Sequence, residues 1–295
     1  MTMAQDSESS RNTWLGELSP SIKRYQYEQK KQLQEVFNIK YSCLLQGDKN
    51  SSECLLFKID NKTFSRDFLN LEDKTSWSSF SKPKGLLLIK MMTKEHGAAI
   101  GAFHTTLILA LTPMGLETAL QPYSSATVKG DERSKQGDNA WGPIRVPRGH
   151  DRGWPTVVLE VAFSEPSRSK LQSDVLFGLG DGRGKVKVVF TLTIDRKSPQ
   201  ISIEKWVLKD GREHCQEQVN ISRNSKGQVH VTGAPPLPLN SKVCSFAPSK
   251  GPRNKTYNSQ RLFLLNWLIL FGRHRVSAIE ILNALIRPGW HSVFL

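Results

Sequence analysis

The sequence predicts an α+β fold in which a central mixed sheet is flanked by helices, with extensions at both ends of the chain. Residues 156–163 are apolar on both strand faces, which is typical of the interior of a sheet. Residues 185–195 and 201–208 alternate apolar and polar side chains and favour a hairpin. The length of 295 residues suits one large domain with extensions.

The N-terminal part is predicted to lie outside the core. Residues 1–20 are polar and rich in Ser, which favours disorder. Residues 21–82 are expected to form an extension made of a helix over 21–37 and a hairpin around the polar turn GDKNSS. The remainder of this extension, residues 61–82, is polar and typical of a loop.

The core is predicted at residues 83–210, beginning with the apolar strand GLLLIKM. A helix follows, and its helical spacing is carried by Ile100, Phe103, Leu107 and Leu111. An extended segment and a loop rich in Gly, Pro and charge then lead to the interior strand.

A second helix is expected after the interior strand, with Ser164 as its N-cap. Its buried stripe is predicted at Leu171, Val175 and Leu179. This helix would return the chain to the hairpin strands, so the core has the order helix, strands, helix, strands.

The C-terminal part reads as an extension. Residues 211–260 are polar, contain PPLPLN and predict a linker. Residues 261–295 predict a helical extension whose apolar run, LFLLNWLILF, is too short to span a bilayer, so no transmembrane segment is expected. Basic residues around this run also allow an interfacial membrane helix over 262–295.

Charge and cysteine content narrow the functional classes. The net charge is +14, and residues 211–295 carry 11 Lys/Arg against 3 Asp/Glu. This excess suits nucleic acid or an acidic membrane as a partner, and a solvated basic face is the alternative. The 4 cysteines form no CxxC pair, which argues against structural zinc. With a polar N-terminus, we expect an intracellular protein, without distinguishing nucleus from cytoplasm.

One acidic residue stands out, because Glu160 lies in the middle of the interior strand. A buried carboxylate is costly unless a cation pairs with it. The partner could be a metal ion shared with Asp138, or a structural partner such as Arg148 or Arg152. Asp138 lies in a charged segment and could equally be a turn residue.

The aromatic residues and histidines near these segments have plainer interpretations. His96 and His104 lie eight residues apart on the first core helix and are more typical of core-edge or surface histidines than of metal ligands. Trp154 is interpreted as packing at the entry of the interior strand, and Trp206 as an aromatic at the edge of the core.

The motifs KMMTKEHGAAI, KQGDNAWGP, WPTVVLEVAFSE, LQSD, KVKVVFTLTI and ISIEKW resemble fungal proteins related to the Uma2-like restriction endonucleases. These belong to the PD-(D/E)xK nuclease superfamily. The resemblance runs from Leu86 to Leu208, about 40% of the chain. It implies a restriction-endonuclease-like core, in which a helix precedes three antiparallel strands and a second helix crosses to a further strand.

The resemblance also implies a site and an activity. Asp138 and Glu160 match the two acidic residues that hold Mg²⁺ in such nucleases, and Glu95 matches an additional acidic residue of part of the superfamily. The implied reaction is Mg²⁺-assisted hydrolysis of phosphodiester bonds, with nucleic acid as the partner. A cation held by two carboxylates would neutralise phosphate charge and help to deprotonate a water.

The chain departs from the superfamily pattern at Ala162, where the motif has a lysine. Lys170 on the second helix, or Lys185 or Lys187 on the next strand, are the candidates to replace it, and we take Lys170 as the first choice. The helix position that carries a relocated lysine in bacterial relatives matches Asp174. The alternative is therefore a non-catalytic module on the same fold that binds nucleic acid or a protein.

Overall fold

A computed structural model gives the fold of the chain. It describes residues 18, 22–48, 51–69, 76–112, 115–124, 126–146, 151, 153–163, 168–195, 198–226 and 228–233. The predictions for residues 1–17, for most of the linker and for the helical extension at 261–295 lie outside these ranges. In the part of the chain that is described, no helix has the length and apolar character needed to cross a membrane.

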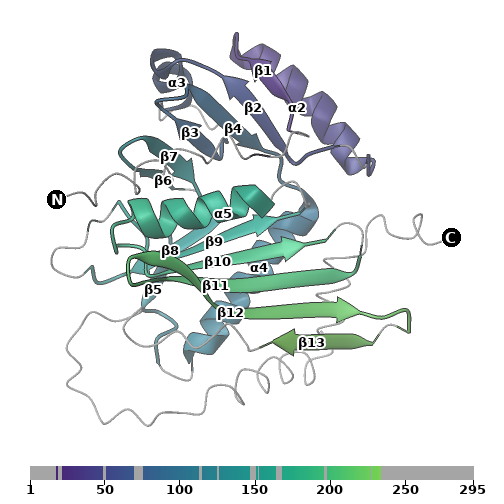
Figure 1. The fold of residues 1–295 in the computed structure, drawn as a ribbon, viewed down its shortest axis with the longest axis vertical. Helices are drawn as coiled ribbons and strands as arrows, with labels where there is room; N and C mark the ends of the chain where they lie inside the picture. Colours follow the sequence, from purple (N-terminus) through teal and green to yellow (C-terminus); the bar gives the residue numbers. More distant parts are fainter. Residues whose placement is uncertain are drawn as a thin grey trace, which may run out of the picture.

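The fold contains two mixed sheets with helices packed beside them (Figure 1). The smaller sheet has the order β1-β2-β4-β3-β7-β6, and the larger has the order β13-β12-β11-β10-β9-β8-β5. The smaller sheet consists of β1 (Arg24–Gln26), β2 (Cys54–Lys58), β3 (Ser79–Ser81), β4 (Leu86–Lys90), β6 (Thr127–Lys129) and β7 (Arg133–Gln136). The larger consists of β5 (Leu120–Pro122), β8 (Asn139–Pro143), β9 (Val157–Ala162), β10 (Val188–Ile194), β11 (Gln200–Lys209), β12 (Arg212–Arg223) and β13 (Val229–Gly233). The helices are α2 (Lys30–Leu45), α3 (Asn61–Phe68), α4 (Lys94–Leu111), α5 (Arg168–Leu176) and the π-helical turn η3 (Phe177–Asp181).

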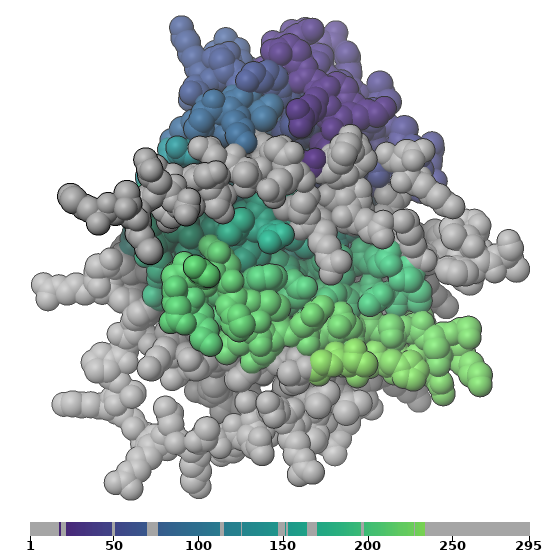
Figure 2. Space-filling model, viewed as in Figure 1, coloured from purple at the N-terminus to yellow at the C-terminus, as the bar shows by residue number. Residues whose placement is uncertain are grey.

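The two sheets form adjoining parts of one molecule. In the space-filling view, the purple and blue part that carries β1 to β4 caps the teal and green part that carries the larger sheet (Figure 2). The chain crosses between them after β7, since β7 belongs to the smaller sheet and β8 to the larger. Residues 137 and 138, which join these two strands, therefore lie where the sheets meet.

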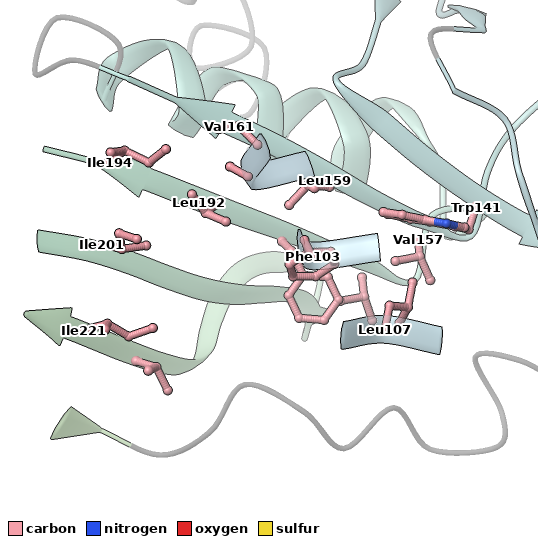
Figure 3. Packing of buried hydrophobic residues seen from close by; sticks show 14 of the residues in the cluster. Phe103, Leu107, Trp141, Val157, Leu159, Val161, Leu192, Ile194, Ile201 and Ile221 are labelled. Atoms are coloured by element: carbon pink, nitrogen blue, oxygen red, sulfur yellow. The ribbon is translucent and has the colours of Figure 1, made fainter. Parts of the chain in front are cut away.

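The main core lies between α4 and one face of the larger sheet (Figure 3). The ring of Phe103 lies 5.0 Å from that of Phe190 and 6.0 Å from that of Trp141, measured between centroids. Leu107 and Leu111 of the same helix are fully buried. Each such side chain contributes about 1.5–3 kcal/mol through burial, so this helix is firmly fixed on the sheet.

The interior strand and its two neighbours match the predicted core. β9 pairs antiparallel with β8 and parallel with β10, and α5 makes the crossover between β9 and β10. Buried positions of the crossover segment include the predicted stripe at Leu171, Val175 and Leu179. Together with α4 and the antiparallel strands β5, β8 and β9, this gives the order that the resemblance implies. The predicted α+β fold with a mixed sheet flanked by helices is confirmed.

The predicted N-terminal hairpin is wrong in its first half. Residues 38–45 continue α2, whose helical turns bring Phe37 and Tyr41 into a stacked pair and let the Ser42 hydroxyl donate to the Asn38 carbonyl oxygen. The helix itself starts at Lys30, later than the predicted start at residue 21. These i,i+4 contacts are the side-chain pairs that a helix, and not a strand, brings together.

Three segments predicted as loop or linker are regular structure. Residues 61–68 form α3 because the Asp60 carboxylate accepts from the Thr63 N–H at 2.9 Å and caps the helix. Residues 133–136 and 139–143 form β7 and β8. Residues 212–233 contain β12 and β13, which pair onto β11, so the expected linker over 211–260 begins with two strands.

Candidate functional site

Asp138 and Glu160 come from neighbouring strands at the junction of the two sheets. Asp138 immediately precedes β8, and Glu160 lies in β9, to which β8 is paired. The Val161 N–H donates to Oδ2 of Asp138 at 2.6 Å, so the carboxylate is fixed beside the residue that follows Glu160. The structure thus brings the two predicted acidic residues into one neighbourhood.

Oδ2 of Asp138 is contacted by a lysine and a histidine as well as by the backbone. It lies 2.6 Å from Nζ of Lys90 and 3.3 Å from Nε2 of His96. Burial acts to raise the pKa of Asp138, but the charges of Lys90 and then His96 outweigh it and hold the pKa well below its usual range. Asp138 is therefore ionised.

Glu160 is completely buried, and its carboxylate faces lysines from two other elements. Its Oε2 lies 3.0 Å from Nζ of Lys135 on β7 and 3.9 Å from Nζ of Lys170 on α5. Its Oε1 has no hydrogen-bond partner among the described residues. Burial raises the pKa of Glu160 to about 7, and the carboxylates of Asp174 and Asp138 act in the same direction against the lysines. Neighbouring carboxylates that repel one another are typical of a site that binds a cation or a proton.

Asp174 joins the three basic residues on the Glu160 side. It pairs with Lys170 at 2.6 Å, with Arg133 at 2.8 Å and with Lys135 at 3.1 Å. Burial opposes its ionisation, yet these cations, Lys135 first, hold its pKa below the usual range. Asp174 therefore orients the lysines that face Glu160.

Two further buried groups connect the smaller sheet to the site. Glu53, just before β2, accepts from the Phe163 N–H at 3.1 Å through Oε2. The same oxygen lies 3.9 Å from Nδ1 of His96, whose other ring nitrogen faces Asp138. Glu53 and His96 are both fully buried. His96 is thus placed between two carboxylates, deeper than the core-edge or surface position expected for it.

Four carboxylates, four Lys or Arg side chains and one histidine therefore meet at this junction, and we call them the junction cluster. Its members are Glu53, Lys90, His96, Arg133, Lys135, Asp138, Glu160, Lys170 and Asp174. The formal charges of the carboxylates and of the Lys and Arg side chains balance. Burying this many ionisable groups is costly, and such clusters are frequent at functional sites.

The remaining predicted residues are less central. Glu95 is half-buried in the first turn of α4 and contributes to none of the ion pairs of the junction cluster. Lys187 is exposed, and Lys185 pairs with Asp151 at 3.0 Å on the surface, so neither strand lysine approaches Glu160. Arg148 and Arg152 lie outside the described residues.

The aromatic interpretations agree with the structure. The Trp141 indole donates to Nδ1 of His104 at 3.1 Å, which makes that histidine a packing partner of the core. Trp154 is buried at the entry of β9 and stacks on Phe177. Trp206 packs, partly buried, at the edge of the same apolar cluster.

A cavity of about 340 Å³ opens beside Asp138. Its charged wall is formed by Lys90 and Asp138. The other lining residues include Ser76, Ser78, Gln136 and Asn139. The volume is within the range of small-ligand pockets. A polar group of a substrate could reach Asp138 through this cavity.

The donor set is compatible with Mg²⁺ but not with a metal caged by protein. Within the described ranges, no group of three or more His, Cys, Asp and Glu side chains is arranged to hold a metal ion. Mg²⁺ commonly takes only one or two carboxylates and completes its shell with water and substrate phosphate. The unpartnered Oε1 of Glu160 and the cavity wall at Asp138 are the positions that suit that mode. Lysines occupy one oxygen of each carboxylate, and Glu160 lines a separate hollow of about 30 Å³ beside Lys135 and Asp174.

Apart from Lys170, the basic residues that surround the carboxylates were missed in the sequence. Lys90 ends an apolar strand, LLLIK, and Lys135 and Arg133 alternate in RSKQ. A charge that ends or interrupts a short strand usually faces solvent. Only the juxtaposition of β4, β7 and α5 shows that these side chains point inward.

Comparison with known proteins finds a likeness among solved structures alone. No protein-family model matches the chain, and no curated protein matches it. Among solved structures, the chain is similar to a protein of Anabaena variabilis that is described as a candidate nuclease of the DUF820 family. The two share 14% sequence identity with a TM-score of 0.35, over 60% of this chain and 88% of that one. At this level of likeness, the function has to be inferred from the geometry of the junction cluster.

Proposed function

We propose that this protein is a nuclease that hydrolyses phosphodiester bonds with the help of Mg²⁺ bound at Asp138 and Glu160. The observation that carries the proposal is the position of Lys135 and Lys170 beside Glu160, at 3.0 and 3.9 Å. The superfamily motif has a lysine on the strand face of the glutamate, and Ala162 cannot supply one. Two other elements, β7 and α5, bring ammonium groups to the same carboxylate.

Asp138 and Glu160 would hold the cation through the oxygens that face the junction. When bound, Mg²⁺ neutralises phosphate charge and lowers the pKa of a bound water. Lys135 and Lys170 would stabilise negative charge that develops on the phosphate, because both are buried and a charge interaction is strong there. Asp174 keeps both lysines in place. The substrate would be nucleic acid, whose backbone a basic chain attracts.

A second candidate function is binding without cleavage, to nucleic acid or to a protein. It is favoured by the charge balance of the junction cluster, in which lysines already pair with Asp138 and Glu160. A self-neutralised cluster of this kind can serve as a structural link between the two sheets. This function predicts binding of DNA or RNA that weakens steeply with salt, and no metal-dependent cleavage.

The two functions are separated by incubating the full chain with plasmid DNA and with single-stranded DNA and RNA. Each substrate is tested with Mg²⁺, with Mn²⁺ and with EDTA. We expect cleavage that requires the metal and is lost in Asp138→Asn and Glu160→Gln, while Asp151→Asn, which alters an exposed carboxylate, retains it. Circular dichroism confirms that each variant is folded.

Two outcomes would count against the nuclease proposal. Cleavage that persists in Glu160→Gln would show that another site, or a contaminant, is responsible. Salt-sensitive binding by the wild type without cleavage under any metal condition would establish the second candidate. If neither cleavage nor nucleic-acid binding is found, the protein-interaction form of the second candidate is what remains.

A further inference from the structure

Lys90 belongs to the smaller sheet, yet its ammonium group lies in the site of the larger one. It is the last residue of β4, and its side chain is only 5% exposed. Nζ donates to Oδ2 of Asp138 and to the main-chain carbonyl oxygen of Val161. Lys90 therefore ties Asp138 to the strand that carries Glu160.

The same lysine forms part of the wall of the 340 Å³ cavity. Ser76, Ser78, Gln136 and Asn139, which carry hydroxyl or amide groups, are among the other residues that line it. Such groups, together with an ammonium group, are the ones that proteins use to contact the phosphate and sugar of nucleic acids. A phosphate that enters this cavity would meet Lys90 and Asp138 together.

An oxygen paired with an ammonium group at 2.6 Å has little capacity left for a divalent cation, since both positive charges would then crowd the same atom. The four-carbon stem of a lysine allows its head group to move without a change in the backbone. The carbonyl oxygen of Val161 offers the head group a second partner.

From this geometry, and resting on the proposed function, we propose that Lys90 is a positioning residue with two partners. It holds Oδ2 of Asp138 until a divalent cation binds, and it then releases that oxygen and donates to a substrate phosphate in the cavity. Lys90 thus competes with the metal for Asp138 and afterwards helps to bind the substrate.

Replacing Lys90 should change the affinity for the metal ion in opposite directions, depending on whether Lys90 competes with the cation or is purely structural. If Lys90 only kept Asp138 in place, its removal would loosen the carboxylate and weaken metal binding. If Lys90 competes with the cation, its removal strengthens metal binding while substrate binding becomes weaker.

The test is a titration of the full chain with Mn²⁺ alone, followed by electron paramagnetic resonance, which needs no activity. We expect Lys90→Met to bind Mn²⁺ about tenfold more tightly than the wild type, the effect of removing one competing ion pair. Lys185→Met, which removes a surface ion pair, should bind Mn²⁺ like the wild type. In cleavage assays, Lys90→Met should show a raised KM, with a smaller effect on kcat.

Unchanged or weaker Mn²⁺ binding in a folded Lys90→Met would overturn the proposal. If Lys90→Met does not fold, Lys90→Gln carries the same expectation, because it removes the charge and keeps a donor for the Val161 carbonyl oxygen. If neither variant folds, Lys90 is a structural residue and the proposal is wrong. A wild type that binds Mn²⁺ without cleaving would refute the nuclease function, while the comparison of Mn²⁺ affinities would still decide the role of Lys90 toward the cation.

Discussion

Nζ of Lys135 lies 3.0 Å from Oε2 of Glu160 and 3.1 Å from Oδ1 of Asp174. The lysine is on β7 of the smaller sheet, whereas the two carboxylates are on β9 and α5 beside the larger sheet. Burial lowers the pKa of Lys135, and the charges of Asp174 and Glu160 oppose that effect. One lysine therefore links both parts of the fold to the residue on which the proposed activity depends.

Replacing Lys135 by Met should destabilise the protein and change the ionisation of Glu160. Lys170, at 3.9 Å, would be the remaining cation within ion-pair distance of Glu160 among the described residues. The pKa of Glu160 should rise above its wild-type value, because Lys135 is the strongest influence that lowers it. We expect a loss of about 3 kcal/mol in the free energy of unfolding at pH 8, as for other broken buried pairs.

Urea denaturation of Lys135→Met at pH 5 and pH 8 measures both effects. The loss should be smaller at pH 5, where Glu160 is protonated and needs no cation. Lys185→Met is the matched control, since its surface pair with Asp151 should contribute about 0–1 kcal/mol. Equal stability of Lys135→Met and Lys185→Met at pH 8 would contradict the assigned role of Lys135.

Titration of Glu160 should also make the free energy of unfolding depend on pH. Its pKa rises from 4.5 in the unfolded chain to about 7 in the folded protein. A raised folded pKa means that the folded state binds the proton more tightly, so this contribution is fully present below pH 4.5 and is lost as the pH rises through 7. The wild type should therefore lose roughly 3 kcal/mol over this interval through Glu160.

Glu160→Gln cannot titrate, so the difference in unfolding free energy between the wild type and this variant should change between pH 4.5 and 7. Asp174 does not affect this comparison, because its pKa is shifted downward. Its contribution to the free energy of unfolding is lost only at a pH below the usual range of a carboxyl pKa. A constant difference across this interval would mean that Glu160 is ionised throughout.

The sequence was sufficient for the centre of the larger sheet, strands β9 to β11, because these strands carry their pattern locally, whereas β8, β12 and β13 of the same sheet were predicted as loop or linker. The buried strand at 157–162, the stripe of α5 and the alternation of β10 each follow from residues close in the chain. In the smaller sheet, the apolar strands β2 and β4 were predicted, whereas β3 and β7 could not be predicted in this way. β3 and β7 are only three and four residues long, and the pairing partners of β7 lie in separate parts of the chain.

Asp138, Glu160 and Lys170 were recognised from the sequence, whereas Glu53 and the other basic residues of the junction cluster were not. Glu160 is an anomaly in an apolar strand, and such an anomaly can be recognised from local sequence alone. Lys90 and Lys135 carry no local signal, because they lie 70 and 25 residues away from Glu160 along the chain. Their role depends on the crossing of the chain between the two sheets at residues 137 and 138.

Asp174 is predicted to be the main structural carboxylate of the junction cluster. Replacing it by Asn would leave Arg133, Lys135 and Lys170 without their shared partner. Since the three cations are buried, we expect the free energy of unfolding to fall by about 3–5 kcal/mol. Thermal or urea denaturation measures this loss.

Asp131→Asn is the matched control for Asp174→Asn, because Asp131 pairs with Arg183 while 81% of its side chain is exposed. This control should change the stability by less than about 1 kcal/mol. If Asp174→Asn were as stable as the control, the cations would have to find other partners, and the proposed ordering of Lys170 by Asp174 would be wrong.

Restoring the superfamily motif should impair the protein. Ala162 is fully buried and lies on the same strand face as Glu160, two residues away. A lysine at this position would add a third ammonium group to a carboxylate that already faces Lys135 and Lys170. We expect Ala162→Lys to lose about 3 kcal/mol in unfolding free energy and to cleave more slowly than the wild type.

Ala162→Met separates the effect of charge from that of size, since it adds a side chain of similar length without an ammonium group. Ala162→Met should be less destabilised than Ala162→Lys. The difference in unfolding free energy between the two variants should decrease only slightly at high salt, because the site is buried and salt screens buried charges weakly. A gain of cleavage in Ala162→Lys would show that the lysine position of the motif is vacant in the wild type. Lys135 and Lys170 would then be structural, and the binding function without cleavage would be the better description of this protein.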